Sequence, residues 1–122
     1  MLNVVSIHIC TDRPQELGDF YRKVLGLEPA WASDEVIGFM IDNFRLEIMG
    51  HSEVSGQNNQ PQRLFFDLMV ADVRVEFARL VKLGATTIQE PYDYADDEIS
   101  FTLATLADID GNYFQLVSMA SD

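Results

Sequence analysis

Cysteine is nearly absent from this chain of 122 residues, which contains only Cys10. No intrachain disulfide can form, so a small disulfide-stabilised extracellular scaffold is excluded, and a cytoplasmic location is predicted. Long hydrophobic runs are also absent, since no apolar stretch approaches the roughly 18 residues that a membrane-spanning helix needs. We therefore expect no membrane association.

Basic residues are scarce as well. Eight Lys and Arg residues stand against twenty Asp and Glu residues, which gives a formal net charge of −12. This charge opposes contact with nucleic-acid phosphates and anionic lipids, so neither is expected as a partner. It is compatible both with simple solubility and with attraction of a cationic ligand. The hydrophobic content of 48% is sufficient for a packed core in one domain.

The chain contains an internal repeat of a strand, a helix closed by Gly, and further strands, the last with one polar residue in an apolar run. In the first half these landmarks are Ile7-His8-Ile9, Leu25-Gly26 and Leu46-Glu47-Ile48. In the second half they are Phe66-Asp67-Leu68, Leu83-Gly84 and Phe114-Gln115-Leu116. Two such units, each forming half of a cupped sheet, would enclose a pocket for a small molecule.

The pattern predicts one domain over residues 1–122. Module one covers about residues 2–50, a polar linker about 51–62, and module two about 63–120. Strands are predicted at residues 4–10, 28–32, 36–41, 44–49, 64–70, 86–89, 100–107 and 112–119.

Helix boundaries and turns also have local signals. A capping box of Asp12 and Gln15 should begin the first helix, and Asp72 should cap the second. An acidic loop over residues 92–98 could cover a pocket. The sequence 108–111 is interpreted as a turn rather than a calcium loop, because the other calcium ligands are missing.

Strand alternation places a mixture of polar and apolar side chains on one face of the sheets. Polar and apolar groups that share one face are typical of a ligand cavity. A half-exposed sheet, or an internal ion pair of Arg45 with a carboxylate, would explain them without a ligand. The predicted ligand-binding residues on this face are His8, Arg45, Glu47, Phe65, Asp67 and Gln115.

Glu47 is the predicted catalytic residue if the protein is an enzyme. Desolvation among Met and aromatic groups disfavours its charged form, which suits a general base or a metal ligand. Arg45 lies two residues earlier on the same face and could instead pair with Glu47 and keep it ionised.

Two segments resemble the vicinal oxygen chelate superfamily, which includes glyoxalase I, bleomycin-resistance proteins and extradiol dioxygenases. They are Phe20-Tyr21-Arg22-Lys23-Val24-Leu25-Gly26-Leu27 and Asp108-Ile109-Asp110-Gly111-Asn112-Tyr113-Phe114-Gln115-Leu116. The resemblance implies an α+β fold in which tandem βαβββ modules form a cupped eight-stranded mixed sheet with helices on the outer face. It also implies a homodimer.

Metal-dependent members of that superfamily place one ligand on the first strand and one on the last strand of each module. The resemblance assigns these positions to Ser6, Glu47, Phe65 and Gln115. Only Glu47 matches the pattern, because Phe65 cannot bind a metal and Ser6 is a poor ligand. A shift by one pleat would offer His8 and Asp67 beside Glu47 and Gln115.

The sequence therefore predicts a small-molecule-binding protein with no metal ligands and no cofactor, and with a ligand that can be cationic. The alternative is a divalent-metal-dependent lyase, isomerase or dioxygenase-like enzyme that uses Glu47.

Overall fold

The computed structural model describes residues 1–119 and divides the chain into two compact units. Unit 1 comprises Met1–Gly56, and unit 2 begins at Gln57. The boundary falls within the expected linker, although the organisation as a single domain stays a prediction. No helix among the described residues is long and apolar enough to cross a membrane.

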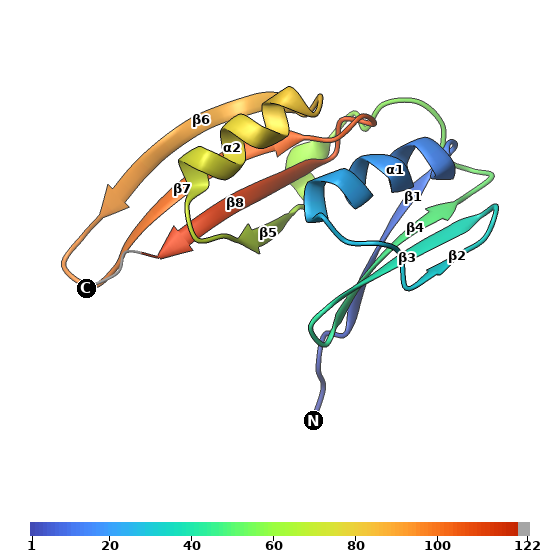
Figure 1. The fold of residues 1–122 in the computed structure, drawn as a ribbon, viewed down its shortest axis with the longest axis horizontal. Coiled ribbons are helices and arrows are strands. Elements are labelled where there is room, and N and C mark those ends of the chain that lie inside the picture. The colour runs from blue at the N-terminus through green and yellow to red at the C-terminus, as the bar shows by residue number, and fades with distance from the viewer. Residues whose placement is uncertain (120–122) are drawn as a thin grey trace. The chain divides into compact units, whose positions relative to one another are not determined.

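Unit 1 contains one helix and a four-stranded sheet (Figure 1). Its elements are β1 (Ser6–Thr11), α1 (Pro14–Leu25), β2 (Trp31–Ala32), β3 (Val36–Ile41) and β4 (Phe44–Gly50). The strand order is β1-β4-β3-β2, with β1 parallel to β4 and the other pairs antiparallel. The first and last strands of the module therefore lie side by side.

Unit 2 repeats this plan after a short 3-10 helix (Figure 1). Its elements are η1 (Pro61–Arg63), β5 (Phe66–Met69), α2 (Val73–Lys82), β6 (Thr86–Ala95), β7 (Ser100–Ala107) and β8 (Tyr113–Met119). The order β5-β8-β7-β6 again pairs the first strand with the last in parallel. The predicted α+β fold of two βαβββ modules is confirmed.

Each sheet buries one face against its helix. In unit 1, α1 packs on β1, β3 and β4 through an apolar stripe that includes Leu17, Tyr21 and Val24. Phe39 and Leu46 are buried on the facing side of the sheet. Figure 1 shows α1 lying along this face. Side chains that alternate with these buried ones project from the opposite face of the sheet. The single helix of unit 1 does not cover that face.

Unit 2 has the same layering, with α2 packed on β6, β7 and β8. Phe114 is fully buried in β8, and its ring stacks on Phe66 of β5 with centroids 6.2 Å apart. Leu80 of α2 and Leu106 of β7 are buried with them. The repeat in the sequence therefore corresponds to two similarly built cores.

The start of α1 differs from the prediction. Its N-cap is Arg13, which makes no side-chain capping bond, so the expected capping box is wrong. Asp12 instead accepts a hydrogen bond from the backbone N–H of Gly56 at 3.1 Å. The Gln15 side chain donates to the carbonyl oxygen of Ser33 at 2.9 Å. Tertiary hydrogen bonds have replaced the local capping pair.

The other helix signals are confirmed. Asp72 caps α2 and accepts a hydrogen bond from the N–H of Val75 at 3.2 Å. Gly26 ends α1 with φ +65°, a left-handed conformation that favours glycine over residues with a Cβ atom.

The predicted acidic loop over residues 92–98 is wrong for most of its length, because β6 continues to Ala95. The pairing of β6 with β7 is interrupted by register shifts on both sides of Gln89. Pro91 lies in the second of these interruptions and has no N–H to donate to the neighbouring strand. The Tyr94 ring stacks on Phe101 with centroids 5.0 Å apart. The predicted strand over 86–89 is thus part of a longer β6–β7 hairpin, and the predicted strand over 28–32 shortens to Trp31–Ala32.

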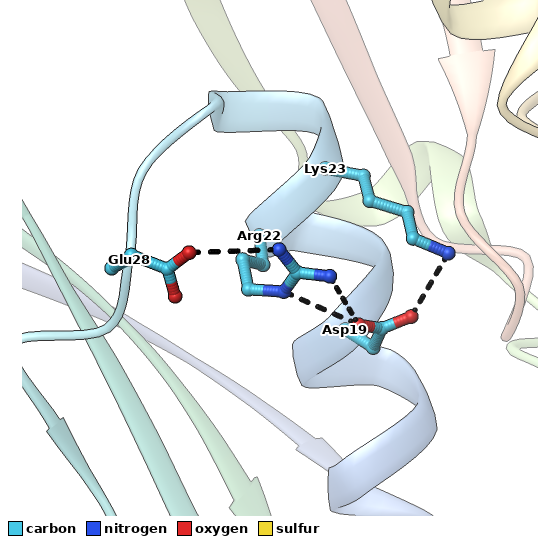
Figure 2. Close-up of polar contacts among 4 residues, drawn as sticks. All are labelled: Asp19, Arg22, Lys23 and Glu28. Atoms are coloured by element: carbon cyan, nitrogen blue, oxygen red, sulfur yellow. Dashed lines mark hydrogen bonds and ion pairs between the residues drawn. The ribbon is translucent and has the colours of Figure 1, made fainter.

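Ion pairs join Asp19 in the middle of α1 to two basic side chains in its last turn (Figure 2). Asp19 contacts Arg22 at 3.0 Å and Lys23 at 3.1 Å, and Arg22 also lies 3.7 Å from Glu28 in the loop that follows. The hydrogen bonds from Arg22 and then Lys23 lower the pKa of Asp19. Basic side chains at this end of the helix also complement its dipole.

We expect Asp19→Asn to lower the free energy of unfolding at neutral pH by only about 0.5 kcal/mol, because exposed helix ion pairs are screened by solvent. The folded-state pKa of Asp19 is depressed. The contribution is therefore present above the unfolded-state pKa of about 4 and is lost as the pH falls through the folded-state pKa.

Urea unfolding at a series of acidic pH values measures this effect. The difference between wild type and Asp19→Asn should shrink towards zero with falling pH, while Asp34→Asn, at an exposed position of the same unit, should differ little throughout. A difference that stays constant with pH would contradict the assignment.

Candidate functional site

The helix-free face of unit 1 collects the polar residues singled out in the sequence. The parallel register of β1 and β4 pairs Ser6 with Arg45, His8 with Glu47 and Cys10 with Met49. Paired residues project from the same face of a sheet. Two strands that are distant in the sequence therefore place His8, Arg45 and Glu47 on one face.

His8 and Glu47 are in direct contact. The Nε2 atom of His8 lies 3.2 Å from Oε2 of Glu47, and its Nδ1 atom lies 2.8 Å from Sδ of Met49. The Glu47 side chain is only 15% exposed, whereas that of His8 is 47% exposed. The imidazole therefore contacts the carboxylate while remaining open to solvent. A ligand on this face would meet a largely buried carboxylate with a second polar group beside it.

Arg45 lies on the same face, but the side-chain contact that the structure shows for Glu47 is with His8. Arg45 is half-buried and lies opposite Met40 of β3 and Ser6 of β1. The expected alternative of an Arg45–Glu47 pair is thus replaced by a histidine pair. The guanidinium group adds a positive charge at one end of a face whose centre is anionic.

Trp31 also belongs to this face, although the sequence pattern did not predict it as a site residue. It is half-buried in β2 and pairs with Gly38 of β3, which in turn pairs with Glu47 of β4. A Cβ atom built on Gly38 would overlap Cε2, Nε1 and Cζ2 of the indole. The ring therefore lies over Gly38 of β3, on the face of the sheet from which Glu47 projects. A glycine inside a strand is a recognised sign of such a close approach.

Unit 2 has its own polar group on the equivalent face. The registers pair Asp67 with Gln115 and Gln115 with Thr105. The Gln115 amide donates to the Thr105 hydroxyl at 3.1 Å. Asp67 is exposed, and Phe65 is 43% exposed just before β5 begins. The structure thus brings Asp67 and Gln115 together and leaves Phe65 outside the strand.

A separate hollow lies in unit 1 at the end of β1 and β4. It is an open pocket of about 460 Å³ whose lining includes Asp12, Glu35 and His51. His51 accepts a hydrogen bond from the N–H of Glu53 at 3.1 Å and thereby shapes the loop after β4. None of the predicted site residues lines this pocket. The pocket and the His8–Glu47 face are distinct features of the unit.

A family model for the glyoxalase-like domain matches residues 6–117, which is nearly the whole chain. This chain belongs to the glyoxalase-like domain family. The predicted relationship to the vicinal oxygen chelate superfamily is confirmed. The match covers both modules, so the repeat is part of the glyoxalase-like domain itself.

Solved structures with the glyoxalase-like fold are similar over almost their full length. One is a glyoxalase/bleomycin resistance protein/dioxygenase family enzyme from Burkholderia phytofirmans PsJN, with a TM-score of 0.79, 19% identity, and coverage of 98% of this chain and 100% of that one. A glyoxalase-related enzyme from Fulvimarina pelagi has a TM-score of 0.77, 17% identity, and coverage of 97% and 88%. At these identities the likeness establishes the fold. No curated protein matches the chain significantly.

The residues of this glyoxalase-like domain do not fit the metal centre of the superfamily's metal-dependent members. Among residues 1–119, no group of three or more His, Cys, Asp and Glu side chains is arranged to hold an ion. Ser6 and Phe65 occupy two of the four ligand positions that the resemblance assigns, and a phenyl ring has no donor atom. His8 and Glu47 supply two donors in unit 1, fewer than the three protein ligands of catalytic zinc sites.

Proposed function

We propose that this glyoxalase-like protein binds a small, positively charged molecule on the helix-free face of unit 1 and that no metal ion takes part. The observation that carries the proposal is the Glu47 carboxylate, which is 15% exposed and contacts His8. A carboxylate that is already partly desolvated attracts a cation more strongly than a fully hydrated one. The net charge of −12 favours the approach of the same class of ligand.

The proposed ligand-binding residues of the unit 1 face are His8, Arg45 and Glu47. Phe65, Asp67 and Gln115 remain proposed ligand-binding residues of unit 2. Small molecules are the ligand class that we consider because structural neighbours bear names such as glyoxalase/bleomycin resistance protein. A homodimer, a cytoplasmic location and the absence of nucleic-acid partners are part of the same proposal.

A thermal-shift screen with size-matched cationic, neutral and anionic small molecules tests the proposal. We expect stabilisation by cations in preference to the other two classes. Glu47→Gln should weaken binding of the best cation by about tenfold or more, because hydrogen bonds to charged groups are worth about 1.5–3 kcal/mol. Glu28→Gln removes an exposed carboxylate outside this face and is the matched control. Equal stabilisation by all three classes, or unchanged binding of the best cation to the Glu47→Gln variant, would refute the proposal.

A second candidate function is a metal-dependent lyase, isomerase or dioxygenase-like enzyme in which Glu47 moves a proton. The adjacency of His8 and Glu47 favours it, because two donors 3.2 Å apart can both reach one ion. Metal analysis of protein purified without chelator separates the two candidates, since the binding proposal expects no stoichiometric divalent metal. About one ion per chain, lost in Glu47→Ala, would overturn the metal-free binding proposal and favour the enzyme alternative.

A further inference from the structure

We propose that the Trp31 indole, seated over Gly38, is a stacking surface that makes the unit 1 face selective for flat cations. This inference rests on the proposed function, since it names the ligand class and adds a specificity-determining residue. Trp31 is the only tryptophan of the chain.

The seat of the indole depends on the absence of a side chain at position 38. Trp31, Gly38 and Glu47 are successive partners across β2, β3 and β4, so all three project to one face. The indole fills the space above Gly38 that any Cβ atom would require. Neighbouring strands lie about 4.8 Å apart, so the ring and the carboxylate are close enough for one small guest to contact both.

The chemistry of the two groups defines the guest. A half-buried indole offers an apolar π surface that attracts cations and stacks on flat rings. The Glu47 carboxylate beyond Gly38 offers the negative charge. A planar ring that carries a permanent positive charge satisfies both groups at once, whereas a compact aliphatic cation uses mainly the carboxylate. Arg45, on the same face, disfavours a second positive charge at its own end of the site.

Three probes separate shape from charge: 1-methylquinolinium is flat and cationic, 1,1-dimethylpiperidinium is cationic but not flat, and quinoline is flat and neutral at pH 7.5. Amide NMR titrations of the full chain would give the dissociation constants, and the same spectra would show whether each variant is folded. We expect 1-methylquinolinium to bind most tightly.

Trp31→Leu should weaken binding of 1-methylquinolinium by about tenfold and that of 1,1-dimethylpiperidinium by about threefold at most. Both cations lose a cation–π contact, but only the flat aromatic ring also loses its stacking on the indole. Trp31→Phe keeps an aromatic face and should restore part of the loss. Gly38→Ala forces the indole to move and should reproduce the selectivity of Trp31→Leu. Leu27→Ala, at an exposed position outside the sheet, should change none of the constants.

The outcomes distinguish this inference from the function on which it rests. If both cations bind through Glu47 but Trp31→Leu weakens them equally or not at all, the stacking role is wrong and the proposed function stands. If neither cation binds, or Glu47→Gln has no effect, the proposed function fails and the stacking role fails with it. Selective loss of 1-methylquinolinium binding in both Trp31→Leu and Gly38→Ala supports the inference.

Discussion

Replacing Phe39 by alanine is expected to lower the free energy of unfolding by about 4 kcal/mol, the usual cost of emptying a fully buried phenylalanine site. Phe39 is 0% exposed in β3 and faces the layer that α1 covers. Its pairing partner in β4 is Leu46, which is also buried. The loss combines the transfer of a large apolar side chain with the cavity left between sheet and helix.

Met40, the next residue of β3, provides the matched control. It is 41% exposed and projects to the face that carries Glu47 and Arg45. Met40→Ala should cost less than about 1 kcal/mol, because little buried area is lost. Urea unfolding followed by the fluorescence of Trp31, which reports on unit 1, measures both changes. Similar losses in the two variants would show that the two faces of β3 are not separated as described.

The candidate face was predictable because strand alternation has a fixed period of two. Once Leu46 and Ile48 are assigned to the core, Arg45 and Glu47 must project to the other side. The structure agrees, since Leu46 and Ile48 are buried and Glu47 meets His8. The pairing of His8 with Glu47 needed one further fact, the parallel register of β1 and β4, which alternation within each strand does not specify.

Trp31 was not predictable in the same way. Its strand has only two residues, which is too short for any periodic signal. The glycine that accommodates its ring is seven positions further along the chain, in another strand. A single glycine inside the apolar run of β3 was the available clue, and it gains meaning only when β2 is known to pair there.

The errors at Asp12 and in β6 have a common cause. Local patterns compete with tertiary hydrogen bonds, and a sequence reveals only the former. Asp12 binds Gly56, which is 44 positions away. The acidic residues after Tyr92 are typical of a loop, yet Asp93 is held by the Thr102 hydroxyl at 2.7 Å and by Arg74 at 3.1 Å. The hydrogen bonds from Thr102 and from Arg74 both lower the pKa of Asp93 within β6.

The turn between β7 and β8, by contrast, was interpreted correctly, and it supports the prediction with the second largest effect. Asp108→Ala should lower the free energy of unfolding by about 3 kcal/mol, because buried backbone donors would lose their acceptor. Asp108 is 4% exposed. Its Oδ1 atom accepts hydrogen bonds from the backbone N–H groups of Asp110 at 2.9 Å and Asn112 at 3.0 Å.

The same turn anchors the segment that precedes β5. Asn58 donates from its backbone to the carbonyl oxygen of Asp110 at 2.8 Å and from its side chain to Asn112 at 3.0 Å. The Asn112 amide is itself oriented by Asp108, whose Oδ2 accepts from it at 3.0 Å. Loss of this carboxylate should therefore release two segments of chain, which is why the expected cost exceeds that of a single surface hydrogen bond.

Far-UV circular dichroism during urea unfolding measures the cost, and Asp108→Asn tests its origin. The amide keeps one acceptor oxygen for the backbone donors, so we expect this variant to lose about half as much stability as Asp108→Ala. Asp97→Ala, in the exposed turn after β6, should remain within about 0.5 kcal/mol of wild type. If Asp108→Ala were as stable as Asp97→Ala, the Asp108 carboxylate would make no net contribution to the free energy of unfolding. The turn would then be held by its backbone alone, including Gly111 with φ +81°.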